Sequence, residues 1–515
     1  MKIVIVGGGT AGWMAALMIS SRHPNHQIEV IESTKIGVIG VGESTTGLLS
    51  DLLNNNLWDF GCNHDEFITE TGASLKYGIK FTGWTPNIDD YYIGPIDGSH
   101  TKLHTPDIFF AYGCANLPKK DLVKTSQTGN YIHKGFTNFD KTTNKFADLT
   151  HAMHVDAHLV GKYFQKVTLR KPNTSHIDAK VLDCTLNDRG HIENIILDDG
   201  RKIDGDFFID CTGFARLLIS KMPGNDWVSY QDNLPVNSGL PFLLDYKENE
   251  LPQPHTHAWA QDAGWMWQIP LLDRIGNGYV FCDQFISADQ AHQEVEKRLG
   301  RKIDPQSVIK FNTGRQKASW INNCLAIGLS SAFLEPLEAT SIHSTIVQIK
   351  NFAFDYLRDD INSIKNEGTI SIYNNRTRQM FDDFKDFLVM HYMGDRTDTE
   401  FWRYISSGAT KTDYIDNLLE TLKIRLPNVN DFPKYYGAAG WPLYSFVMEG
   451  LNLVNKNIAR NELNFNAPNI GPIYEAVEEN YLQTQQFWHE TYSKFATWEE
   501  MITHFRILRK NYVNS

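Results

Sequence analysis

Three glycines near the N-terminus have the spacing that allows a peptide backbone to approach a phosphate group. Gly7, Gly9 and Gly12 form the pattern G-x-G-x-x-G, directly after the apolar run Lys2–Val6 and before the helical pattern WMAALMIS. The apolar, β-branched run is typical of a buried parallel strand. Gly7 would permit the tight turn, Gly9 the approach to a pyrophosphate, and Gly12 the close packing of helix on strand. Amide groups at the start of the helix would bind the phosphates.

An acidic residue stands at the expected distance from this loop. The next predicted strand, QIEVIES, carries Glu32, twenty residues after Gly12, and its carboxylate would accept hydrogen bonds from a ribose. Thr10 and Ala11 complete the loop. Strand, loop, helix and acid together predict a dinucleotide site, but they do not distinguish NAD from FAD.

Two later segments favour FAD. Phe207–Asp210 reads as a strand followed by Cys-Thr-Gly, and Cys324–Ile327 reads as another, followed by a turn at Gly328 and a long helical pattern. FAD is long and touches the ends of several strands. Three such segments, far apart in the sequence, therefore suit an FAD domain whose sheet is interrupted by insertions.

Composition restricts the classes of protein and of partner. The 515 residues, 42% hydrophobic and 21% charged, are enough for two or three domains or one large interleaved enzyme. The net charge of -12 argues against nucleic acid or an anionic membrane as a partner. The 6 cysteines show no CxxC and the 18 histidines no metal-ligand spacing, which predicts free thiols in a reducing cytoplasm and no metal site. We expect no transmembrane helix, because no apolar run is long enough.

The stretch GWMWQIP concentrates indole rings. Trp265 and Trp267 are two residues apart, ahead of Ile269 and Pro270. In a strand both indoles would point to the same face and bury a large area together. Packing in the core explains the stretch without any ligand, and the choice between core and site depends on the rest of the chain.

The chain resembles the flavin-dependent halogenases of the tryptophan-halogenase type. The resemblance spans most of the chain in family order, and its combination of motifs is specific. It rests on GGGTAGW at 7–13, GVGEST at 40–45, WMWQIP at 265–270 and FLEPLEATSIH at 333–343, with support from ASLKYGIKF at 73–81, HVDAHLV at 154–160, FIDCTGF at 208–214 and DTEFW at 398–402.

The resemblance implies an enzyme that halogenates aromatic molecules. A separate NADH-dependent flavin reductase would supply reduced FAD, which with oxygen and a halide ion gives hypohalous acid. The matching lysine is Lys76, in SLKYG, and the matching glutamate is Glu338, in EPLEAT. Lys76 would polarise hypohalous acid, or form a haloamine if neutral. Glu338 would orient the acid and accept the proton from the ring.

The residues alone leave a rival for each of these two. Lys80 lies four residues after Lys76 and would share a face with it in a helix or in a strand. Glu335, beside Pro336, precedes Glu338 by three residues and is also explained as an acid that starts a helix. The motif, and not the spacing, selects Lys76 and Glu338.

Binding residues follow from the same resemblance. Beyond the first loop, the flavin would contact Gly42 and Glu43 of GVGEST, together with Gly328 and Leu337. The indoles and the Ile-Pro of WMWQIP would line a tunnel between flavin and lysine, keeping organic substrate and water away from the flavin.

The halide would bind at Thr340 and Ser341, where amide groups begin a helix. Chlorinases of free tryptophan usually have Thr-Gly at this position, and this chain has Thr-Ser. Serine adds bulk and a hydroxyl, so bromide and iodide are candidates as good as chloride.

The substrate is expected to be an indole, a phenol or a larger electron-rich aromatic, and not free tryptophan. Halogenases of free tryptophan carry a tyrosine pair, an acid and then Phe-Trp near the C-terminus. Tyr435 and Tyr436 are present here, but no E-x-x-x-F-W follows them. Ordinary packing explains the two tyrosines equally well.

The predicted fold is mixed α/β, a Rossmann-like FAD domain of the aromatic-hydroxylase type with an interleaved, largely helical substrate subdomain. We assign residues 1–85, 150–225 and 255–355 to the FAD-binding core, and 86–149, 226–254 and 356–515 to the substrate region. Helical patterns occur at 417–426, 476–495 and 498–512. The sequence leaves a homo-oligomer open, and a flavin-dependent aromatic monooxygenase is the alternative function.

Overall fold

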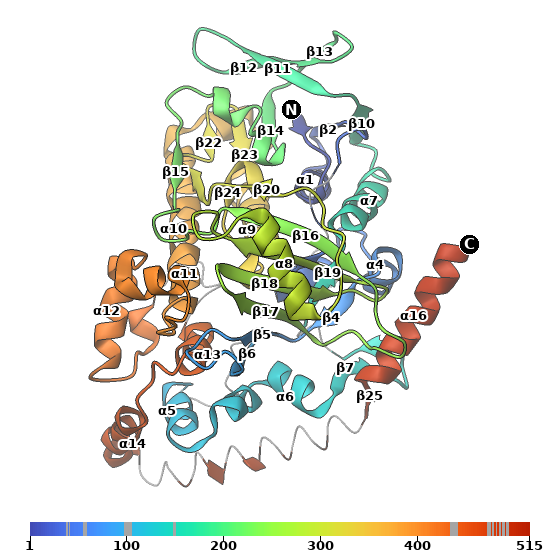
Figure 1. The fold of residues 1–515 in the computed structure, drawn as a ribbon. Coiled ribbons are helices and arrows are strands. Elements are labelled where there is room, and N and C mark those ends of the chain that lie inside the picture. The colour runs from blue at the N-terminus through green and yellow to red at the C-terminus, as the bar shows by residue number, and fades with distance from the viewer. Residues whose placement is uncertain are drawn as a thin grey trace. The chain divides into compact units, whose positions relative to one another are not determined.

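The chain forms two compact units, each built from three segments. The computed structural model describes residues 1–37, 40, 42–54, 59–96, 106–147, 151–432, 441–470, 475, 478–479, 482–483, 486, 490 and 494–515. The first unit comprises Met1–Ala73, Val155–Gln231 and Phe311–Asp382, and the second Ser74–His154, Asp232–Lys310 and Asp383–Ser515. Figure 1 shows their elements along the chain.

A six-stranded sheet forms the centre of the first unit. Its order is β10-β2-β1-β14-β23-β22, and all neighbours are parallel except β22 and β23. The central strand β1 is buried along most of its length, as its apolar run predicts. The strands are β1 (Lys2–Val6), β2 (Gln27–Glu32), β10 (Thr174–Asp178), β14 (Phe207–Asp210), β22 (Trp320–Ile321) and β23 (Cys324–Ala326).

Helices and two small sheets complete the first unit. α1 packs against both α7 and α9, and the carboxylate of Asp156 caps the start of α7. The helices are α1 (Thr10–Arg22), α2 (Gly47–Leu52), α4 (His64–Thr71), α7 (Ala157–Thr168) and α9 (Thr340–Lys350), and a π-helical turn, η6 (Asn351–Tyr356), follows α9. The small sheets contain β11 (Val181–Leu186), β12 (Ile192–Leu197) and β13 (Lys202–Asp204), and β15 (Trp227–Ser229), β21 (Gly314–Gln316) and β24 (Ala332–Phe333).

The second unit is built on a seven-stranded sheet in the order β20-β16-β19-β18-β17-β5-β6. Only β17 and β5 pair in parallel. Helix α8 (Ala288–Leu299) covers part of this sheet (Figure 1), where Ala291 and Val295 pack against strand residues such as Phe242 and Tyr279. The strands are β5 (Gly78–Thr82), β6 (Tyr91–Pro95), β16 (Ser238–Leu244), β17 (His255–Gln261), β18 (Gly264–Pro270), β19 (Ile275–Phe281) and β20 (Ile309–Lys310).

Short strands and helices surround that sheet. β4 (Ser74–Lys76) pairs with β9 (Ala152–Val155), and β7 (Phe136–Asp140) pairs with β8 (Lys145–Phe146) and β25 (Phe495–Thr497). The helices are α5 (Pro106–Asn116), α6 (Gln127–Lys134), α11 (Glu400–Tyr404), α12 (Asp413–Leu422), α13 (Trp441–Gly450), α14 (Lys456–Ile470) and α16 (Trp498–Asn514). α10 (Glu367–His391) has residues in both units. No helix among the described residues is long and apolar enough to cross a membrane.

The mixed α/β fold with a Rossmann-like parallel sheet is confirmed. The compact units, however, divide the chain at other places than the predicted boundaries. Residues 255–310 lie in the second unit, because β17 pairs with β5 and β19 with β16. That unit therefore contains a large sheet in addition to helices. Which segments bind flavin and which bind substrate stays a prediction.

The helical patterns of the C-terminal third are recovered where the structure describes them. α12 lies slightly earlier than the predicted 417–426, and α16 contains the predicted 498–512. Most of the pattern at 476–495 lies outside the described residues. So do both Tyr435 and Tyr436.

Candidate active site

The glycine loop of the first unit leaves room for a ligand. Gly7 has φ +107°, and a Cβ there would lie 2.3 Å from the carbonyl oxygen of Cys211. A Cβ on Gly12 would lie 1.8 Å from the carbonyl oxygen of Gly7, whereas a Cβ on Gly9 would meet no atom within 4 Å. α1 starts at Thr10 without a side-chain cap at Gly9, and its first amides remain available to an anion. The loop therefore fits a pyrophosphate.

Glu32 lies at the end of β2, beside the loop. Its Oε1 accepts hydrogen bonds from Trp13 Nε1 and Gln165 Nε2, both at 3.2 Å, and lies 3.2 Å from His176 Nε2. Its Oε2 faces Gly8 and takes no hydrogen bond from the residues that the structure describes. Burial raises the pKa of this carboxyl group. The free oxygen is the acceptor that a ribose hydroxyl requires.

Segments distant in the sequence meet at this loop. Gly328 has φ +67°, and a Cβ there would lie 2.9 Å from the Cβ of Ala11. Thr10 Oγ1 donates to the carbonyl oxygen of Ala157 at 2.9 Å. Leu337 is buried, 1% exposed. The three predicted nucleotide segments thus lie together at the carboxyl ends of parallel strands.

Asp210 organises this edge of the sheet and was absent from the predicted site. Its carboxylate is fully buried and accepts hydrogen bonds from the amides of Leu218 and Ile219, both at 2.8 Å, and from Thr212 and Ser330. The acidic residue that ends the apolar strand FFID could have indicated this role, because a buried carboxylate needs hydrogen-bond donors around it.

The predicted halide residues begin helix α9. A 3-10 turn, Pro336–Glu338, leads to Ala339, whose φ of +57° redirects the chain into the helix. Thr340 is 3% exposed, and its buried Oγ1 has no hydrogen-bond partner among the described residues. Ser341 is half-buried and uses its carbonyl oxygen to accept from Ser344 and Thr345. A buried hydroxyl at a helix start fits an anion.

The two candidate glutamates differ in burial. Glu335 is fully buried, whereas Glu338 is half-buried on the 3-10 turn that precedes α9. Burial alone would have selected Glu335, and the motif selects Glu338. The sequence contained no information on this difference, because both residues flank the same Pro-Leu pair.

Gly42 and Glu43 enter strand β3 (Glu43–Ser44). Gly42 is buried with φ +152°. Burial, and secondarily the charge of Asp156, raises the pKa of Glu43 to about 7. Nearby, His343 Nδ1 and Thr46 Oγ1 are 2.8 Å apart, and burial lowers the pKa of His343 to about 4. This region therefore disfavours fixed charge on its side chains.

The raised pKa of Glu43 predicts a pH effect on stability. Between its ordinary value of 4.5 and about 7, the folded chain retains a proton that the unfolded chain has lost, so the free energy of unfolding falls as pH rises through this window. Replacing Glu43 with glutamine removes this contribution to the pH dependence of the free energy of unfolding. We expect the variant, relative to the unmodified protein, to gain about 1–3 kcal/mol between pH 5 and pH 8. Urea unfolding of the flavin-free proteins at several pH values measures this difference. If the free energies of unfolding of the two proteins changed with pH in parallel, the prediction would be wrong.

Lys76 lies at the end of β4 in the second unit and is 1% exposed. β4 pairs with β9, which places Ser74 opposite His154. Ser74 Oγ donates to the carbonyl oxygen of Pro270 and lies 3.2 Å from His154 Nδ1. These contacts connect the lysine strand to the end of the W-x-W-x-I-P strand.

His154 is a further residue that the predicted site omitted, although the motif HVDAHLV contained it. Its Nε2 is 2.9 Å from Thr256 Oγ1. Burial, together with the positive charge of Lys76, holds the pKa of His154 well below its ordinary value. A neutral His154 adds no second positive charge beside the buried Lys76.

Lys80 is in a different setting from Lys76. The two were expected to share a face, but they lie on separate strands, β4 and β5, that pair with different partners. The ammonium of Lys80 lies 4.4 Å from the ring centroid of Tyr91, and burial lowers its pKa. The comparison of faces does not apply, because β4 ends at Lys76 and β5 begins at Gly78.

The two tryptophans of β18 are part of an aromatic cluster. Trp265 is 1% exposed, and the centroids of Trp265 and Trp267 are 6.4 Å apart in an edge-to-face arrangement. Trp267 lies over Gly278 of the neighbouring strand, where any Cβ would collide with the indole. Trp84 lies between Trp265 and Trp402, at 6.4 Å and 5.8 Å. Ile269 and Pro270 are buried at the end of the strand.

Comparison with known proteins shows the family of the chain. A family model described as tryptophan halogenase matches residues 2–461. The chain is 33% identical over 481 residues to a 7-chloro-L-tryptophan 6-halogenase of Kutzneria sp. (strain 744), covering 86% of this chain and 89% of that protein. The chain belongs to the tryptophan halogenase family. Members of this family are flavin-dependent halogenases, so the chain is an oxidoreductase of that class.

Other tryptophan halogenases and solved structures extend the comparison. A tryptophan 7-halogenase of Lentzea aerocolonigenes is 30% identical, with 85% of each chain covered. The structure of a tryptophan C-6 flavin-dependent halogenase (chlorinase) from taromycin biosynthesis superposes with a TM-score of 0.82, at 26% identity over 99% of both chains. A flavin-dependent halogenase from Xanthomonas campestris gives 0.83 at 27% identity, covering 98% of both chains.

Proposed function

We propose that the protein uses reduced FAD, oxygen and a halide ion to halogenate an electron-rich aromatic molecule at Lys76. The observation that carries the proposal is the buried lysine. Lys76 is 1% exposed on a strand whose Ser74 is hydrogen-bonded to the last residue of the W-x-W-x-I-P strand. A lysine is rarely buried unless it has a function or a charged partner, and this one stands at the position of the family's motif.

The first unit supplies groups that fit FAD and a halide ion. The amides that begin α1 would hold the pyrophosphate, with Gly7 and Gly9 allowing its approach, and Glu32 Oε2 would accept a ribose hydroxyl. The orphaned Oγ1 of Thr340 and the amides of Thr340 and Ser341 would hold the halide. When bound, reduced FAD supplies hypohalous acid from oxygen and halide. The further flavin contacts that we propose are Thr10, Ala11, Gly12, Gly42, Glu43, Gly328 and Leu337.

Lys76 would hold and polarise hypohalous acid. An ammonium group in a dry site hydrogen-bonds the oxygen and makes the halogen more electrophilic. The ring carbon forms the carbon–halogen bond and the oxygen–halogen bond breaks. The hydroxide released becomes water by taking up one proton, which is balanced by the proton that the ring passes to Glu338. If the site held Lys76 neutral, its amine would instead form a haloamine.

Glu338 would accept the proton that the ring loses. Half-buried, it is close enough to solvent to pass that proton on, which a general base must do to turn over. Glu335, being fully buried, is better explained as a structural acid. We therefore retain Glu338 as the catalytic carboxylate.

The aromatic cluster would protect the reaction from water. Trp265 and Trp267, with Ile269 and Pro270, form a packed apolar surface on β18, reinforced by Trp84 and Trp402. Such walls limit hydrolysis of a reactive oxidant. The two interpretations of GWMWQIP, packing in the core and a wall beside the reaction, are thus compatible. The indoles are core residues and would also act as a barrier.

The substrate class includes tryptophan, indole and phenol. The curated relatives named above act on tryptophan or chlorotryptophan by their names, and they give no support to our expectation that free tryptophan is excluded. Tyr435 and Tyr436 lie outside the described residues. We therefore propose an electron-rich aromatic, with a separate NADH-dependent reductase supplying reduced FAD.

A substrate and halide panel tests the proposal. Purified protein with FAD, a flavin reductase, NADH and oxygen would receive tryptophan, indole or a phenol, each with chloride, bromide or iodide. Mass spectra would be read for halogenated and hydroxylated products. A halogenated product that depends on the added halide supports the proposal. A hydroxylated product without halogen would assign the protein to the aromatic monooxygenases.

Flavin affinity tests the nucleotide part of the site separately. Replacing Glu32 with glutamine removes the charged acceptor and is expected to weaken FAD binding about tenfold or more, since a hydrogen bond to a charged group contributes about 1.5–3 kcal/mol. Glu29→Gln is the matched control, because Glu29 is on the same strand but pairs with Lys2. Fluorescence titration of flavin-free protein gives both constants. Equal losses in the two variants would remove Glu32 from the site.

A further inference from the structure

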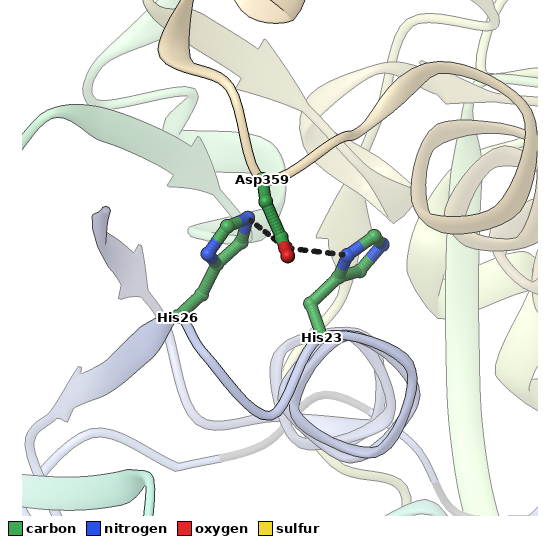
Figure 2. A group of neighbouring side chains, drawn as sticks. All are labelled: His23, His26 and Asp359. Carbon is green, nitrogen blue, oxygen red and sulfur yellow. Dashed lines mark ion pairs between the residues drawn. The ribbon is translucent and has the colours of Figure 1, made fainter.

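Two histidines and an aspartate meet on the first unit, at the far end of α1 from the glycine loop. His23 and His26 flank the turn between α1 and β2, and Asp359 follows η6. One ligand atom from each residue lies within 4.8 Å of the others. Figure 2 shows the carboxylate of Asp359 between the two imidazole rings. Because the 13 residues of α1 span about 20 Å, this cluster is separate from the proposed flavin site.

The carboxylate is oriented toward the rings. Asp359 Oδ1 lies 4.0 Å from His23 Nδ1 and 3.9 Å from His26 Nε2. Asn25 Nδ2 donates to the other oxygen, Oδ2, at 3.1 Å. The side chain of Asp359 is 64% exposed, whereas those of His23 and His26 are 10% and 1% exposed. An ion could therefore reach the two buried nitrogens from the solvent side, where the carboxylate is exposed.

The hydrogen bonding of His23 leaves a lone pair that faces negative charge. His23 Nε2 lies 2.6 Å from the carbonyl oxygen of Ala353. A carbonyl only accepts hydrogen bonds, so Nε2 carries the ring proton and Nδ1 carries the lone pair. Burial lowers the pKa of both histidines, which favours their neutral forms. A lone pair opposite a carboxylate oxygen is stabilised by a cation placed between them.

His26 is the weaker ligand of the two. Its Nε2 lies 3.2 Å from the carbonyl oxygen of Arg358, and its Nδ1 is buried with no hydrogen-bond partner in the described part of the chain. To bind a metal through Nε2, the ring must keep its proton on Nδ1. This requirement costs free energy and predicts an affinity below that of a structural zinc site.

We propose that His23, His26 and Asp359 bind one divalent transition-metal ion, of which zinc is the candidate. Two imidazoles and a carboxylate are typical zinc ligands, whereas magnesium and calcium prefer oxygen. In a tetrahedral zinc site the ligand atoms are about 3.3 Å apart, so the pairs at 3.9 and 4.0 Å must close by about 0.6–0.7 Å. The two imidazole nitrogens, which lie within 4.8 Å of each other, must approach as well. Rotation of the exposed Asp359 would bring its oxygen closer to both rings, small rotations of the imidazoles would supply the rest, and water would complete the shell.

The bound ion would stabilise the first unit and take no part in halogenation. It would fasten the turn between α1 and β2 to the segment after η6. The histidines' contacts with backbone carbonyls and the hydrogen bond from Asn25 to Asp359 already join the turn to η6 and that segment. The site was not predicted from the sequence, because Asp359 is far along the chain from His23 and His26. This inference is independent of the proposed halogenation.

Zinc binding to the full chain tests it. Chelator-treated protein would be titrated with zinc by calorimetry, and with cobalt to record the visible absorption of a tetrahedral nitrogen-ligated ion. We expect one zinc per chain, a zinc-dependent rise in melting temperature, and at least about a tenfold loss of affinity in Asp359→Asn. Asp359 is exposed, so this variant should fold.

Two control variants make the test specific. Asp360→Asn removes the same charge one residue along, and asparagine can keep the cap that Asp360 provides to the amide of Asn362. His292→Gln removes a surface histidine 3.3 Å from Glu296 Oε1. Both should bind zinc as the unmodified protein does. Equal affinity in Asp359→Asn and the controls, or no bound equivalent in the unmodified protein, would overturn the proposal.

Discussion

Replacing Lys76 with methionine is expected to lower the rate of aromatic halogenation by about 10²–10⁴-fold, the range typical of a lost acid–base or electrophilic group. Methionine keeps an unbranched, flexible chain in the buried position and removes only the ammonium. FAD affinity should not change, because the glycine loop is in the other unit. The measurement is the initial rate of halogenated product, by mass spectrometry, with reductase in excess.

Lys80→Met is the matched control for this variant. Lys80 is a partly buried lysine four residues away, with its ammonium over the ring of Tyr91. We expect Lys80→Met to retain the rate of the unmodified protein within a few fold. Melting temperatures of both variants would exclude unfolding as the cause. A rate lost in Lys80→Met and kept in Lys76→Met would reverse the assignment.

Replacing Glu338 with glutamine is expected to reduce the halogenation rate by about 10²–10³-fold, because an amide cannot accept the proton that the ring loses. Glutamine preserves the size of the side chain on the 3-10 turn before α9. Stability should change little, since Glu338 is only half-buried. Rates at several pH values and a urea unfolding curve measure the two effects.

Glu335→Gln tests whether Glu335 is a structural acid or the catalytic carboxylate. Glu335 is fully buried, and a change at a buried acid acts mainly on stability. We expect this variant to shift the unfolding curve more than the rate per folded molecule. If Glu335→Gln abolished turnover in a fully folded protein while Glu338→Gln remained active, Glu335 would be the catalytic carboxylate.

Local patterns were sufficient to predict the strands and the helix around the glycine loop of the first unit. The apolar run before Gly7, the glycine spacing and the acid at Glu32 are all contained in a short stretch of sequence, and β1, α1 and β2 follow that prediction closely. The later strands at Phe207 and Cys324 were also readable, because a buried parallel strand is apolar throughout. Family motifs placed Lys76 and Trp265 where the structure buries both.

Long-range pairing set the limit of the prediction. Nothing in the sequence of β17 or β18 says that they pair with each other and that β17 pairs in parallel with β5, so the large sheet of the second unit was not foreseen. Hydrogen-bond networks were missed for the same reason. His154 and Asp359 acquire their partners from segments distant in the chain, and so does Asp210 in its contact with Ser330. Periodicity carries no information on such contacts.

Trapping the oxidant tests the central claim, that hypohalous acid is made independently of Lys76 and used at Lys76. The unmodified protein and Lys76→Met would each be supplied with reduced FAD, oxygen, bromide and the aromatic substrate found in the panel, together with a small halogen acceptor in solution. We predict that Lys76→Met brominates the solution acceptor at a rate close to that at which the unmodified protein consumes oxidant, and yields almost no brominated substrate. Brominated substrate formed by Lys76→Met at the unmodified rate would contradict the account.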